Sequence, residues 1–118
     1  MKLSSMVMTT VLIGSFLMSG PAPALTMNQF VSICEAAKRE CSEHPLLNAY
    51  VGGALDLIAM LDEETDYLSE VYCKPTKELF DVSEIIRYME TRRTEYADKN
   101  AMLVLIRYLE EQGGCTPR

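Results

Sequence analysis

The sequence predicts an all-α domain, a small bundle of four to five helices held by disulfide bonds. Two observations predict the helices. Apolar residues recur at helical spacing along most of residues 27–112, as they do on the buried face of a helix. No segment alternates between polar and apolar residues with the period of two that indicates a strand. The disulfides are predicted from a third observation, the 4 Cys of a short chain that carries an export signal.

The first 24 residues predict a secretory signal peptide that is removed. Lys2 is followed by no charged residue before Glu35, and residues 6–18 are almost wholly apolar. This run is shorter than the ~20 residues that a membrane-spanning helix needs. Ala22-Pro23-Ala24 supplies the small residues of a cleavage site. We therefore expect a mature domain of residues 25–118 in the periplasm, rather than a protein that keeps an uncleaved membrane anchor.

Two helices are expected in the first half of the mature chain. The first spans residues 27–41, and Thr26-x-x-Gln29 gives its start the pattern of a capping box. The second spans residues 45–61 and has proline at its first position, where proline is favoured. Gly52-Gly53 inside this helix costs about 1 kcal/mol per glycine. We therefore expect another helix or a loop to approach these glycines closely.

The second half predicts two longer helices and a short one. Asp81-x-x-Glu84 opens one helix with another capping pattern. Asp98 caps the last helix, residues 99–112, and Gly113-Gly114 ends it in the usual manner. The short helix is expected at residues 66–72.

All the cysteines lie in the predicted mature domain: Cys34, Cys41, Cys73 and Cys115. An even number in a small exported domain predicts two disulfides. Two turns of the first predicted helix would hold Cys34 and Cys41 ~10 Å apart at Cα, beyond the ~7 Å limit for a bridge. Of the two remaining pairings we expect Cys41–Cys73 with Cys34–Cys115. The C-x-x-C pairs typical of structural zinc are absent from the sequence, so we expect no metal and no cofactor.

Composition and motifs favour a binding protein over an enzyme. The chain has 11 Lys+Arg against 17 Asp+Glu, and nucleic acid or an anionic membrane would require a basic surface. It contains one His, no Ser/His/Asp arrangement and no glycine-rich phosphate loop, so the usual catalytic sets are missing. The adjacent carboxylates of Glu63 and Glu64 leave an acid/base pair as an alternative. We expect no catalytic residue, no nucleic-acid partner and no membrane contact after signal removal.

The stretch 62–67 is the first candidate for partner binding. It combines four carboxylates with a tyrosine, whose ring is an amphipathic anchor. Such a patch attracts a basic partner and speeds encounter with it. The alternative is that these acidic residues serve solubility alone.

Several short motifs follow one another along the mature chain. Cys34 in the first predicted helix is followed by Tyr50-x-x-Gly53-x-x-Asp56, then by Cys73-Lys74-Pro75, and a last helix has Cys115 close behind it. In this order they resemble the periplasmic immunity proteins of type VI secretion amidase toxins. The resemblance covers nearly all of the mature chain.

The resemblance implies an all-helical, exported and often dimeric protein. Such a protein binds an incoming papain-like peptidoglycan amidase and blocks its active-site groove, which protects the producer or its siblings. Since occlusion would use exposed loops, the loop 94–98 joins the candidates. The candidate partner-binding residues are Asp62, Glu63, Glu64, Asp66, Tyr67, Glu95, Tyr96 and Asp98. The alternative function is that of a small periplasmic chaperone or stress protein.

Overall fold

The computed structural model describes residues 24–116, and over this range the fold is all-α, as the sequence predicts. The elements are α1 (Met27–Ala36), the 3₁₀ turn η1 (Cys41–Glu43), α2 (Pro45–Glu64), α3 (Thr76–Leu79), α4 (Val82–Thr91) and α5 (Ala101–Gln112). None of these helices has the length and apolar character needed to cross a membrane. The predicted signal peptide, residues 1–24, lies outside the described residues except for its last residue.

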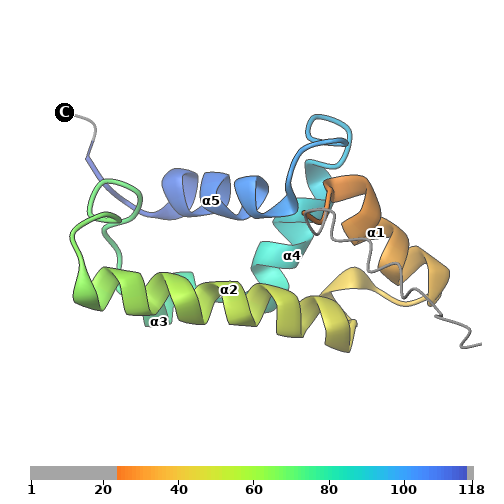
Figure 1. The fold of residues 1–118 in the computed structure, drawn as a ribbon, viewed down its shortest axis with the longest axis horizontal. Helices are drawn as coiled ribbons and strands as arrows, with labels where there is room; N and C mark the ends of the chain where they lie inside the picture. The colour runs from red at the N-terminus through yellow and green to blue at the C-terminus, as the bar shows by residue number, and fades with distance from the viewer. Residues whose placement is uncertain (1–23, 117–118) are drawn as a thin grey trace, which may run out of the picture.

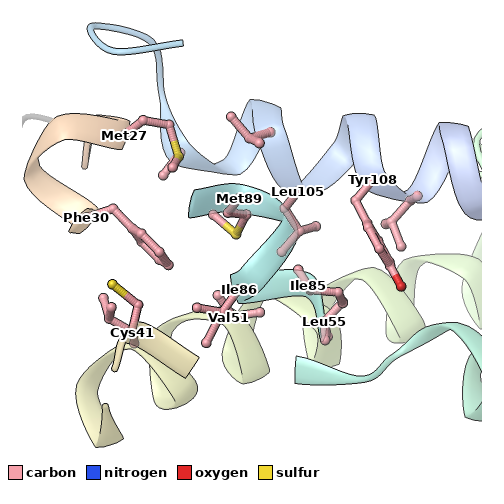
Figure 2. Close-up of a cluster of buried hydrophobic side chains, with 14 of the residues drawn as sticks. Met27, Phe30, Cys41, Val51, Leu55, Ile85, Ile86, Met89, Leu105 and Tyr108 are labelled. Atoms are coloured by element: carbon pink, nitrogen blue, oxygen red, sulfur yellow. The ribbon is translucent and has the colours of Figure 1, made fainter. Parts of the chain in front are cut away.

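Helix α4 forms the centre of the core. Figure 1 shows α2 and α5 running along the molecule on either side of α4, with α1 at one end. Helix α4 packs against α1, η1, α2 and α5. Its apolar side chains Ile85, Ile86 and Met89 are fully buried, and Figure 2 shows them between the side chains of α2 and those of α5. The buried faces of four elements therefore converge on one short helix.

Local signals set most helix starts as predicted. The Thr26 hydroxyl accepts a hydrogen bond from the Gln29 N–H at 3.2 Å, and the Gln29 side chain accepts one from the Thr26 N–H at 2.9 Å. This confirms the capping box. Pro45 occupies the first turn of α2. The Asp81 carboxylate accepts from the Glu84 N–H at 3.0 Å and caps α4.

The predicted cysteine pairing is wrong, because the first helix is shorter than expected. Helix α1 ends at Ala36, and Lys38 takes a left-handed backbone conformation with φ of 52°. The chain therefore turns back before η1, and the Cα atoms of Cys34 and Cys41 lie 5.0 Å apart. These two cysteines form one disulfide, and Cys73 forms the other with Cys115.

Two expectations about the second half also fail. Residues 66–71 form a bend and turns, and the short helix lies instead at Thr76–Leu79. Asp98 does not cap the last helix. The cap is Asn100, whose side-chain oxygen accepts a hydrogen bond from the Met102 N–H at 2.9 Å. The reason is that α5 begins at Ala101, which leaves Asp98 in the preceding loop.

The close approach expected at Gly52-Gly53 occurs instead at Gly113. Among the described residues, no atom would lie within 4 Å of a Cβ added to either glycine of α2. A Cβ on Gly113 would lie 2.6 Å from the Cβ and 2.7 Å from the Cα of Tyr72. The Gly113 carbonyl also accepts hydrogen bonds from the N–H groups of Cys73 and Lys74, both at 2.8 Å. Gly113 therefore lets the end of α5 lie against the segment before α3.

Alanine at these two kinds of glycine is expected to have opposite effects. Gly113→Ala should lower the free energy of unfolding by roughly 2 kcal/mol, because the new methyl group collides with backbone that cannot move freely. Gly52→Ala should raise it by about 1 kcal/mol, because alanine favours the helix and meets no neighbour. Urea denaturation of the two variants measures both changes. A shift of the same sign in both would contradict this assignment of the close contact.

Candidate functional site

The structure separates the two predicted groups of partner-binding residues. Asp62, Glu63 and Glu64 form the last turn of α2, and the turn that follows contains Asp66 and Tyr67. Glu95, Tyr96 and Asp98 lie in the loop between α4 and α5. Figure 1 places these groups at opposite ends of α5, a helix of 12 residues and hence about 18 Å long. They do not form one patch.

The second group is partly engaged within the chain. The Asn28 N–H in the first turn of α1 donates to the Ala97 carbonyl at 3.0 Å, which fixes the loop. The Glu95 carboxylate lies 3.4 Å from the Arg92 guanidinium. Tyr96 is half-buried against the core. The loop between α4 and α5 therefore presents a smaller free surface than its composition indicates.

The first group is exposed and carries uncompensated charge. All four of its carboxylates are exposed, and none takes part in the ion pairs found within residues 24–116. Tyr67 is 83% exposed. The structure thus leaves the stretch 62–67 accessible, as a binding role would require.

Asp62 differs from its acidic neighbours because its carboxylate lies near the side chain of Tyr72. The hydroxyl of Tyr72 is buried and has no hydrogen-bond partner within the described part of the chain. Burial, and then the nearby Asp62 carboxylate, raise the pKa of Tyr72. Among the acidic residues of the stretch 62–67, Asp62 is the one that acts on this tyrosine.

Sequence reasoning missed an apolar strip on the outside of α2. Leu46, Leu57 and Met60 are 57%, 55% and 46% exposed. Together with Gly53 they follow one line along the helix, at spacings of seven, four and three residues. We call these four residues the outer strip. A helix with apolar residues on both sides is normally covered on both, which is the signal that could have revealed this surface.

The buried side of α2 faces the other way. Val51, Leu55 and Ile58 are buried on α2, and Figure 2 shows the first two pointing toward α4. On a helix of 3.6 residues per turn, these positions lie nearly opposite the outer strip. The core therefore uses one face of α2 and leaves the outer strip without a partner among residues 24–116.

Negative charge lies along one side of the outer strip and at its end. Between Arg39 and Lys74 the sequence has no Lys or Arg but eight Asp and Glu residues. Of these, Asp56, Glu63 and Glu64 lie exposed on α2 itself. An apolar strip with acidic residues beside it attracts a basic, partly apolar surface.

A surface hollow of about 420 Å³ lies beside the first disulfide. Burial, and then the Glu40 carboxylate, raise the pKa of Glu90 in this hollow, while Arg87 opposes the shift. The two sulfurs and a Glu90 oxygen lie within 4.8 Å of one another. Both sulfurs are in the disulfide, so neither is the thiolate that zinc binds. The hollow is lined by Val31, Cys34, Glu35, Lys38, Arg39, Glu40, Cys41 and Glu90.

A cluster of aromatic and charged residues joins α4 to α5. The rings of Tyr88 and Tyr108 meet edge to face with centroids 5.2 Å apart. The Arg92 guanidinium lies 4.9 Å from the centroid of the Tyr88 ring and 3.2 Å from the Glu111 carboxylate. These contacts stabilise the packing of the two helices.

Ionisation of Tyr88 is expected to weaken the fold at alkaline pH. Burial, and then Glu111, raise its pKa from 10.0 to about 12, although Arg92 opposes the shift. A phenol with a raised pKa stabilises the folded state below its unfolded pKa, and this stabilisation is lost as the pH rises from 10 to about 12. Urea denaturation across this window should show a falling free energy of unfolding. Tyr88→Phe should make the fall shallower, and equal slopes in the two proteins would contradict the assignment.

Comparison with known proteins identifies no relative. No protein-family model matches the chain, and no curated protein and no solved structure matches it.

Proposed function

We propose that this protein is an exported immunity protein that binds a type VI secreted peptidoglycan amidase and occludes its active-site groove. This protects the producer or its siblings from the toxin. The family comes from the order of the sequence motifs, from the first-helix Cys34 to the closing Cys115. The binding role is supported by one structural observation, the exposed outer strip with its acidic surroundings. Large apolar side chains gathered on one face of a surface helix are typical of interaction sites.

A rigid frame suits this role. The Cys73–Cys115 disulfide fastens the chain end beside Tyr72, and the Cys34–Cys41 disulfide fastens the end of α1 to η1. Since a pre-organised surface loses little conformational entropy on binding, it inhibits more tightly than a flexible one. Occlusion needs such a fit and no chemistry in the inhibitor.

The proposed site of action is the periplasm. Two disulfides are consistent with an oxidising compartment. The leader, residues 1–24, supplies the proposed export signal. The homodimer that the resemblance implies is part of the same proposal.

The test is inhibition of a papain-like peptidoglycan amidase encoded beside this gene. Purified protein should abolish hydrolysis of peptidoglycan at about one copy per enzyme, and cells that export it should survive periplasmic expression of the enzyme. Mass spectrometry of the protein from these cells should find a chain beginning at Leu25. Full toxicity in its presence, or a retained leader, would overturn the proposal.

A further inference from the structure

We infer that the outer strip of α2 is a docking surface for a basic amphipathic helix of a partner protein. The inference rests on the proposed function for the identity of that partner. It assigns the surface that makes the contact and the chemistry that the surface recognises.

The apolar character of the outer strip is the first argument. Single exposed leucines are common on protein surfaces and need no partner. Here Leu46, Leu57 and Met60 lie on one line of one helix, each about half exposed. The line runs from Leu46 to Met60, fourteen residue steps along α2, or about 21 Å. A straight strip of this length fits a second helix lying along it.

Gly53 gives the second argument. It lies on the line between Leu46 and Leu57, and no described atom would come within 4 Å of a Cβ there. Glycine in a helix interior costs about 1 kcal/mol relative to alanine, and no contact within residues 24–116 offsets this cost. A glycine flanked by large apolar side chains allows the backbone of a partner helix to approach closely.

The negative charge beside the outer strip favours a basic partner helix. The carboxylates of Asp56, Glu63 and Glu64 lie exposed on α2 and form no ion pair within the described range. A second copy of this chain docked on the outer strip would bring together two acidic surfaces, each without Lys or Arg between Arg39 and Lys74, and would be repelled. A helix with apolar residues on one face and Lys or Arg on its borders would bury the outer strip and neutralise the carboxylates beside it.

A designed peptide tests this chemistry directly. The probe is a helical peptide of about 18 residues, about 27 Å long, which is enough to cover the whole outer strip. It carries Leu on one face, Lys on both borders and one Trp. Because the protein has no Trp, the fluorescence of the peptide reports binding without background. The Lys peptide should bind, more weakly as salt rises, and a matched peptide with Glu in place of each Lys should not bind.

Variants of the protein locate the contact. Leu57→Glu should weaken binding of the Lys peptide at least about tenfold. Leu103→Glu is the matched control, because Leu103 is an exposed leucine on α5, and binding should change less than about twofold. Gly53→Ala should also weaken binding while raising the free energy of unfolding. A misfolded variant would lose both peptide binding and stability. Weaker binding by a more stable variant would therefore show that the loss of binding does not come from misfolding.

Four results would overturn the inference. The first is equal weakening by Leu57→Glu and Leu103→Glu, and the second is equal binding of the Lys and Glu peptides. The third is a homodimer, measured by sedimentation, that Leu57→Glu dissociates. Full inhibition of the amidase by the Leu57→Glu variant would also overturn the inference and leave the proposed function standing. Peptide binding without inhibition by the unaltered protein would overturn the proposed function alone.

Discussion

Replacing Cys73 and Cys115 together by serine is expected to lower the free energy of unfolding by about 4 kcal/mol. The same change at Cys34 and Cys41 should cost only about 2 kcal/mol. The two bonds close loops with sequence separations of 42 and 7 residues, and a longer loop restricts the unfolded chain more strongly. The first value is a large part of the stability of a domain of this size. Urea denaturation of the two double variants measures both losses in the free energy of unfolding.

The same variants test which cysteines are paired. If the pairs were crossed, each double variant would break both disulfides, and the two losses of stability would be equal. Protease digestion without reduction gives an independent control. Mass spectrometry should find a fragment that joins Cys34 to Cys41, and a fragment that joins Cys41 to Cys73 would contradict the structure.

Phe30→Ala is expected to cost about 4 kcal/mol, because it removes a fully buried aromatic side chain and leaves a cavity. Phe30 is 0% exposed. Its ring lies 6.3 Å from the ring of Tyr50, centroid to centroid, and Figure 2 shows it pointing inward from α1 near Cys41. This side chain therefore joins α1 to α2. The loss is measured by urea denaturation of the oxidised protein, with both disulfides intact.

Leu103→Ala is the control for that prediction. Leu103 lies exposed on α5, and its replacement should change the free energy of unfolding by less than about 0.5 kcal/mol. Equal losses in the two variants would contradict the burial of Phe30.

The starts of α1, α2 and α4 could be predicted because they depend on neighbouring residues. The Thr26 capping box and the Asp81 cap use partners three residues away, and Pro45 fixes its own backbone angle. The end of α1 could not be predicted in the same way. Lys38 adopts a positive φ, which is uncommon for a residue other than glycine. The early end of the helix changed the predicted disulfide pairing.

The candidate site was predicted only in part. The charge and the exposure of the stretch 62–67 follow from its composition. The outer strip was missed, because apolar periodicity in α2 does not tell which side the rest of the chain covers. The loop 94–98 was grouped with the stretch 62–67, although α5 lies between them.

The sequence by itself determined that this protein is helical and acidic and has four cysteines. Helical periodicity and helix caps depend on residues close together in the chain, and net charge and cysteine number depend on composition alone. Only the tertiary structure decided which cysteines meet, that Gly113 rather than Gly53 makes a close contact, and which face of α2 stays uncovered. These features depend on where residues far apart in sequence come together. Their positions are set by the packing of all the helices around α4, which no local pattern specifies.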